Sequence, residues 1–176
     1  MKKAKSCCFI QGAFNFFEGV EEEKEINKKI MEKITEQIDY LIEKEQISEF
    51  YTGMESGADL FYAQYVLSKK EEKNLKLYCV IPFEEQAASY SEKERDLYFY
   101  IAEKSDGEIM IDRKRGFGCK EKRDQYMMEK SDIIILLHNM NHPTHNLNLQ
   151  KIDKTKQIIV VDPFNSKRNA SFKCVV

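Results

Sequence analysis

The sequence has no C-x-x-C pair among its five cysteines, which are Cys7, Cys8, Cys79, Cys119 and Cys174. An odd number of cysteines without paired spacing argues against a disulfide framework and against a cysteine-based zinc site. Cys7, Cys8 and Cys79 fall in apolar runs, where a free cysteine behaves as a small hydrophobic residue. This pattern fits a reducing compartment, so we expect a cytoplasmic protein without a metal or other cofactor.

No apolar stretch approaches the roughly 20 residues that a membrane-spanning helix needs. Basic residues open the chain as they would a signal peptide, but the apolar run 6–13 is too short and is broken by Gly12. We interpret this region as the approach to a first strand and expect no membrane partner.

The sequence also lacks an excess of charge of either sign. Its 28 basic and 30 acidic residues give a net charge of −2, which argues against a nucleic-acid partner because no global field would attract one. One local cluster of basic residues stands out: Arg113, Lys114, Arg115, Lys120, Lys122 and Arg123. A solvent-exposed face is the simpler interpretation of this cluster.

No internal repeat, low-complexity linker or change of composition divides the 176 residues. With 42% apolar residues the chain can bury a real core. We therefore expect a single domain over residues 1–164, followed by a peripheral tail over residues 165–176.

Short apolar runs alternate with stretches of helical periodicity along the chain. The runs that predict strands are 6–10, 49–52, 75–81, 108–111, 132–137 and 157–161. The predicted helices are 21–45, 58–73, 91–105 and 119–130, with a further short helix over 147–154. Ser91 and Glu94 have the spacing of a capping box at the start of the third helix.

This alternation predicts an α/β fold with about six mainly parallel strands and crossover helices. Sheets of this kind bind ligands at the carboxyl ends of their strands. Chemistry is therefore expected in the loops that follow the first, second, third and fifth strands.

The strand-to-helix turn over residues 52–59 has the composition of an anion-binding turn. Gly53 and Gly57 lack Cβ atoms, so backbone amides can approach a ligand, and a helix N-terminus favours a phosphate. Asp59 lies in the first helical turn, where its carboxylate can accept from amides or from a ribose hydroxyl. The sequence matches neither G-x-G-x-x-G nor a Walker loop, and a purely structural glycine turn is the alternative.

Arg123 and Asp132 are candidate site residues, but read alone a structural role is the simpler interpretation of each. Arg123 can pair with a phosphate or with a surface carboxylate, and Asp132 can hold a loop amide. Cys119 lies at a helix start near lysines, which can lower a thiol pKa, but a packing role is simpler.

The histidines His138, His142 and His145 have a spacing that is typical of metal clusters. No paired Asp or Glu completes the ligand set. We expect no metal dependence.

Six separated stretches carry a pattern in one order along the chain: 52–59, 63–67, 80–86, 118–127, 131–133 and 160–163. Together they resemble the DUF1273 (YpsA-like) family of the SLOG superfamily, which is related to the Smf/DprA and LOG (Lonely Guy) proteins. The resemblance covers about residues 5–163.

The resemblance implies a Rossmann-like doubly wound fold and a nucleotide or related phosphate-ribose ligand. By similarity, the ligand-binding positions are Gly12, Gly53, Gly57, Asp59, Pro82, Phe83, Arg123 and Asp132. Gly12 is the glycine that the stretch 10–15 retains.

Two loops depart from the family pattern. Residues 10–15 lack the usual basic residue and proline, and residues 139–146 lack the usual Gly-Gly-Thr turn. The Pro-Gly-Gly signature of the LOG phosphoribohydrolases is also absent, which argues against an enzyme.

We therefore predict a nucleotide-binding or sensing module with partly degenerate phosphate loops. One alternative is a hydrolase of the N-glycosidic bond that uses Asp59, Glu55 or Glu84. Another is a protein-interaction module with a vestigial pocket, in which Phe14, Phe16 and Phe17 form the contact surface. The sequence leaves open a homo-oligomer or a protein partner.

Overall fold

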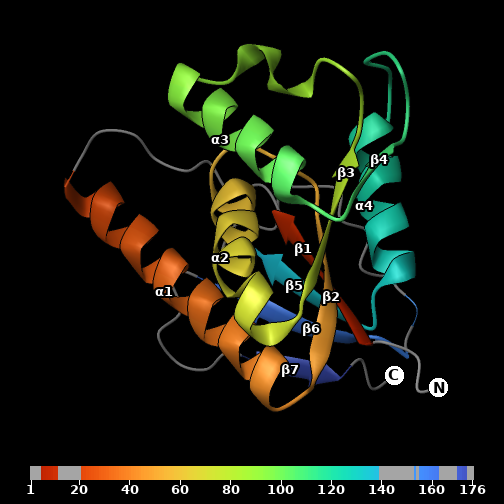
Figure 1. Cartoon of the computed structure of the whole chain (residues 1–176). Helices are drawn as coiled ribbons and strands as arrows, with labels where there is room; N and C mark the ends of the chain where they lie inside the picture. Colours follow the sequence, from red (N-terminus) through yellow and green to blue (C-terminus); the bar gives the residue numbers. More distant parts are fainter. Residues whose placement is uncertain (1–4, 12–20, 139–152, 154, 163–169, 174–176) are drawn as a thin grey trace.

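The computed structural model describes residues 5–11, 21–138, 153, 155–162 and 170–173 (Figure 1). Its strands are β1 (Lys5–Gln11), β2 (Ile47–Thr52), β3 (Lys76–Ile81), β4 (Gly107–Met110), β5 (Ile133–Leu137), β6 (Gln157–Val161) and β7 (Ala170–Lys173). Its helices are α1 (Glu21–Glu43), α2 (Ala58–Lys73), α3 (Glu92–Lys104) and α4 (Cys119–Lys130), with a short 3₁₀ helix η1 (Gln86–Ser89). All six predicted strands and the four long predicted helices are confirmed within a few residues.

The strands form one sheet in the order β4-β3-β2-β1-β5-β6-β7. The first six pair in parallel, which confirms the predicted Rossmann-like α/β fold. β7 was not predicted, and it pairs with β6 in the antiparallel sense within the tail. A short edge strand can form through main-chain hydrogen bonds to its neighbour, so it needs no alternating apolar pattern of its own.

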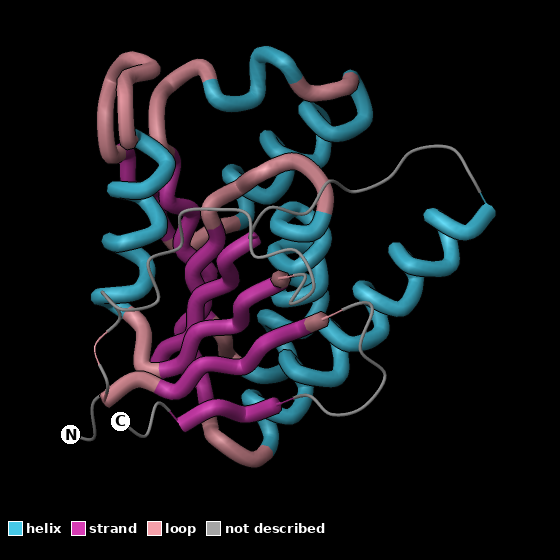
Figure 2. Tube along the Cα trace, turned by 180° about the vertical axis from the view of Figure 1, so that it is seen from behind, coloured by secondary structure: helices cyan, strands magenta, loops and turns pink. Residues whose placement is uncertain are grey.

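Helices cover both faces of the sheet, as Figures 1 and 2 show from opposite sides. On one face, α1 packs against α2 and α2 against α3, whereas α4 lies on the other face against β1 and β3. Strand alternation divides the core between the faces. Cys7 and Phe9 of β1 point towards α1 and α2, and Cys8 and Ile10 point towards α4.

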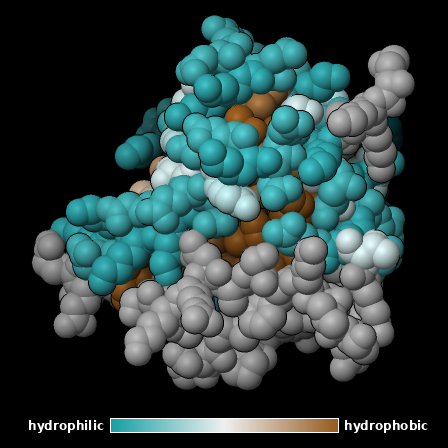
Figure 3. Space-filling model, turned by 90° about the horizontal axis from the view of Figure 1, so that it is seen from below, coloured by the Kyte–Doolittle hydropathy of each residue, from teal (hydrophilic) through white to brown (hydrophobic). Residues whose placement is uncertain are grey.

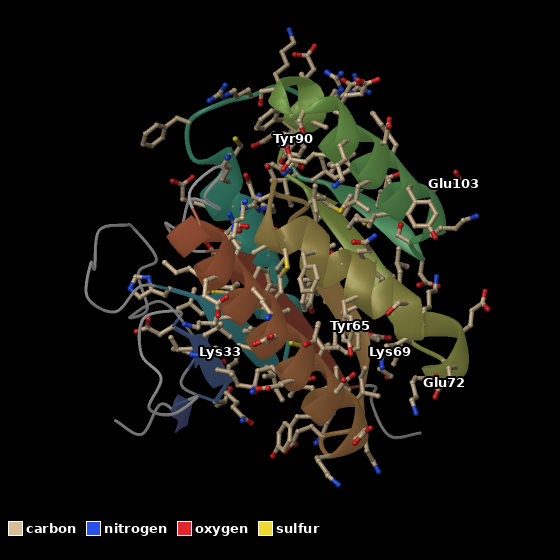
Figure 4. All side chains as sticks on the ribbon, turned by 90° about the vertical axis from the view of Figure 1, so that its left-hand side faces the viewer. Lys33, Tyr65, Lys69, Glu72, Tyr90 and Glu103 are labelled. Atoms are coloured by element: carbon tan, nitrogen blue, oxygen red, sulfur yellow. The ribbon has the colours of Figure 1, made fainter. Side chains whose placement is uncertain are left out.

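Polar contacts between α1 and α2 supplement this packing. The Tyr65 hydroxyl of α2 donates to Asp39 of α1 at 2.8 Å, and the Lys69 ammonium lies 3.6 Å from the same carboxylate (Figure 4). From below, the described surface is mostly hydrophilic, with hydrophobic residues visible in limited patches (Figure 3). Within the described residues, no helix is both long and apolar enough to cross a membrane.

β1 is the topological switch point of the sheet, because its neighbours β2 and β5 are reached by connections on opposite faces. In open α/β sheets, ligands bind in the crevice outside the carboxyl ends of the strands at such a point. Gln11 ends β1 there, and the predicted β2–α2 turn lies on the same edge of the sheet.

Candidate functional site

The turn between β2 and α2 is closed by Asp59, whose side chain is 1% exposed. Its carboxylate accepts from the Thr52 hydroxyl at 2.7 Å and from the Glu55 amide at 3.1 Å. The Thr52 oxygen in turn accepts from the Met54 amide at 3.2 Å. Asp59 therefore organises its own turn, and this matches the structural alternative for this residue.

Two residues in the turn have backbone conformations with positive φ. Gly57, just before α2, has φ 91° and ψ −119°, a conformation that is accessible essentially to glycine alone. Met54 is a buried non-glycine residue with φ 58°. Such strain persists only where the surroundings fix the backbone, and it concentrates at functional sites.

Arg123 reaches from α4 into this turn and is itself buried, at 4% exposure. One terminal guanidinium nitrogen (Nη1) donates to Glu55 at 2.7 Å and to the Gly53 carbonyl at 3.3 Å. Its Nε donates to Asp124 at 2.9 Å. A Cβ atom on Gly53 would come within 2.8 Å of that Nε, so the missing side chain of Gly53 makes room for Arg123.

Burial and ion pairing shift the pKa values of the three carboxylates in and beside this turn. Burial raises the pKa of Asp59 to about 7, although Arg123 and Thr52 partly oppose the shift. Burial would also raise the pKa of Glu55, but Arg123 and Lys120 outweigh it and hold that pKa below its usual value. Burial raises the pKa of Asp124 in spite of its contact with Arg123.

Backbone amides at the start of α2 already donate hydrogen bonds to side chains of the protein. The Glu94 carboxylate of α3 accepts from the Ser56 hydroxyl and from the Gly57 amide. The Asp59 amide donates to the side-chain oxygen of Gln11 at 3.2 Å. The position that favours an anion at this helix end is thus filled by a carboxylate of the protein itself.

The segment after β3 holds the same turn from a third side. The Gln86 amide nitrogen donates to the Gly53 carbonyl at 2.9 Å. The Tyr90 hydroxyl donates to the Met54 carbonyl at 3.0 Å, and Figure 4 shows Tyr90 beside the α2 end nearest to α3. The carbonyl groups of the turn are therefore also bound within the protein.

A cleft of about 310 Å³ opens beside this segment, at the carboxyl ends of β3 and β4. Main-chain hydrogen bonds continue beyond the strands here, from the Asp112 amide to Pro82 at 3.2 Å and from the Glu84 amide to Arg113 at 3.3 Å. The Arg115 guanidinium lies 6.0 Å from the centre of the Phe83 ring. The cleft is lined by Phe83, Glu84, Glu85, Arg113, Lys114 and Arg115.

The sequence of residues 12–162 matches the model of a known protein family, described as the YspA SLOG family (YpsA). The chain belongs to this family. The resemblance seen in the sequence motifs is thereby confirmed, and membership suggests a nucleotide-related function. No curated protein matches the chain.

In this SLOG protein, six of the eight predicted ligand-binding residues fall into two groups. Gly53, Gly57, Asp59 and Arg123 meet in and around the β2–α2 turn, and Pro82 and Phe83 lie at the end of β3 on the same edge of the sheet.

Asp132 is not brought to this edge. It lies just before β5, at the opposite end of the strand, and its carboxylate accepts from the Ser6 amide at 2.9 Å. This contact matches the structural alternative for Asp132, and we leave the residue out of the candidate site.

Other predictions fall outside the described residues and stay predictions. These concern Gly12, the phenylalanines Phe14, Phe16 and Phe17, the altered loop 139–146 and the short helix over 147–154. His142 and His145 also lie there, so the expected lack of metal dependence is untested. In the part of the chain that the structure describes, no three His, Cys, Asp or Glu side chains form a group that could hold a metal.

The sequence interpretation missed three residues of the candidate site, Gln11, Gln86 and Glu94. Gln86 falls in a stretch that resembles the family, and Glu94 was expected only as a local helix cap. Gln11 lies at the end of the first strand, where position alone could have suggested it.

Proposed function

We propose that this SLOG protein binds a nucleotide or a related phosphate-ribose compound at the carboxyl edge of its sheet, as a binding or sensing module. Family membership supports a nucleotide-related role. The edge adjoins the switch point at β1, where ligands of doubly wound sheets bind.

The observation that carries this proposal is the convergence of three chain segments on the β2–α2 turn. Gln11 from β1 contacts the Asp59 amide, Gln86 after β3 contacts Gly53, and Arg123 from α4 contacts both Gly53 and Glu55. These contacts hold the strained turn in one conformation through groups of the protein itself. A preformed wall of this kind loses little conformational entropy on binding.

The contacts that the buried carboxylates already make within the protein favour a binding module over an enzyme. Asp59 is buried and holds a hydroxyl and an amide, and Glu55 is paired with Arg123 and Lys120. A general acid or base must reach the reacting group. Of the three carboxylates that the hydrolase alternative invokes, Glu84 alone lines the cleft.

Thermal unfolding with added ligands tests the proposal. Nucleoside monophosphates, ADP-ribose and NAD should be compared with adenosine, which lacks a phosphate. A ligand present at 100 times its dissociation constant stabilises the native state by about 2.7 kcal/mol, so at least one phosphorylated compound should raise the melting temperature. If none does so at millimolar concentration, and calorimetry detects no binding, the proposal is wrong.

A further inference from the structure

The groups that first suggest phosphate binding are already engaged within the protein. Lys120, Lys122 and Arg123 each lie in an ion pair with a carboxylate, at 3.0, 3.0 and 2.7 Å. At the α2 N-terminus, the Gly57 and Asp59 amides donate to Glu94 and Gln11. A phosphate placed in the β2–α2 turn would have to displace these contacts.

The cleft at the ends of β3 and β4 offers a different set of cations. Arg113, Lys114 and Arg115 are exposed and line it. Within the described part of the chain, none of the three forms an ion pair with a carboxylate. Guanidinium and ammonium groups are the side chains that bind phosphate most strongly.

We propose that this cleft, and not the β2–α2 turn, binds the phosphate-ribose part of the ligand. The inference rests on the proposed function. Arg113, Lys114 and Arg115 bind the phosphate, and Glu84 and Glu85 accept hydrogen bonds from ribose hydroxyls, a role that acidic residues serve in other nucleotide sites. Phe83, 7% exposed, forms an apolar wall.

The mixed charge of the cleft selects the class of ligand. A continuous phosphate backbone would bring further negative charges against Glu84 and Glu85, so the cleft disfavours nucleic acid. A ligand with one phosphate and neighbouring hydroxyl donors fits both, because the phosphate pairs with the basic residues and the hydroxyls donate to the carboxylates. The hydrogen bonds that join residues 82–84 to residues 112–113 hold the two walls of the cleft together.

An NMR titration with ribose 5-phosphate tests this placement, because the probe contains phosphate and hydroxyls but no base. Amide resonances of residues 83–85 and 113–115 should shift, while those of residues 55–59 stay in place. Shifts confined to residues 55–59, or no shift at millimolar probe, would overturn the inference. Shifts in the cleft support it even if no complete nucleotide raises the melting temperature, in which case the proposed function alone fails.

Charge-reversal variants give a second, independent result. The double substitution Arg113→Glu and Arg115→Glu should weaken ribose 5-phosphate binding by tenfold or more, equivalent to about 1.4 kcal/mol. Arg95→Glu, at an exposed position of α3 outside the cleft, is the matched control. Glu84→Gln with Glu85→Gln should weaken binding of the probe but not of inorganic phosphate. Nucleotide binding that survives the double arginine reversal would overturn the cleft placement and leave the proposed function standing.

Discussion

The buried guanidinium of Arg123 lies directly against the backbone of Gly53, so close that a Cβ atom at Gly53 would be 2.8 Å from Nε and 2.9 Å from Cζ. Arg123 cannot move aside easily, because its guanidinium is ion-paired with both Glu55 and Asp124. Gly53 is therefore needed for packing within the protein, whatever the ligand.

Replacing Gly53 with alanine should destabilise the fold. The added methyl group overpacks a buried site, which costs about 1–3 kcal/mol, and the shift of Arg123 would weaken its ion pairs. Urea denaturation should show a lower midpoint. Gly116→Ala is the matched control, because its new Cβ would meet nothing closer than the Lys114 carbonyl at 4.0 Å. Equal midpoints for the two variants would contradict this packing role.

Asp59 should make stability depend on pH in an unusual direction. Burial raises its pKa to about 7 from 3.8, so between these values the folded protein holds a proton that the unfolded chain releases. The stability from this group is full below the unfolded pKa and is lost as pH rises through the folded pKa. The wild type should therefore lose stability with rising pH, relative to Asp59→Asn, by up to about 1.4 kcal/mol per pH unit.

Urea denaturation of both proteins between about pH 5 and about pH 8 measures this difference. Other carboxylates titrate in both proteins and largely cancel in the comparison. The curves should diverge up to about pH 7 and then run parallel. A constant difference across the range would show that Asp59 is ionised throughout.

The fold was predictable because its signals are local. The aliphatic run of β5 and the Ser91–Glu94 capping box can each be read from a few neighbouring residues, and both are confirmed. The candidate site was predictable only in its position at the ends of the strands. Arg123 and Gly53 are 70 residues apart, and no short-range pattern predicts that they meet.

The role of Glu94 in the site could not be predicted for the same reason. Its spacing from Ser91 predicted a capping box, but its contact with Ser56 spans 38 residues. Whether a helix N-terminus binds a ligand or a carboxylate of the protein depends on tertiary packing, which the sequence of the turn does not contain. The phosphate expected beside Gly57 therefore has a competitor that could not be seen in the sequence.

Glu94→Gln should loosen the β2–α2 turn without unfolding α3. Glutamine can keep the capping box, but it loses the negative charge that faces Ser56 and the start of α2. Hydrogen exchange at residues 55–58 should become faster, with a loss of stability of about 1 kcal/mol. Glu92→Gln is the control, since Glu92 is exposed in the same helical turn. Unchanged exchange in the Glu94 variant would show that Glu94 does not hold the turn.

The last prediction is that purine nucleoside monophosphates incubated with this protein release no base above a trace. Positioning of a bound substrate can contribute about 7–11 kcal/mol of barrier lowering, and the sequence lacks the loop signatures that position it in the hydrolases of the superfamily. Asp59 and Glu55 are held in contacts within the protein, so of the three carboxylates named for a hydrolase, Glu84 is the one that lines the cleft. Chromatography of the reaction mixture measures free base directly. Sustained turnover that Glu84→Gln abolishes in a folded variant, while Glu92→Gln retains it, would replace the binding module with an enzyme.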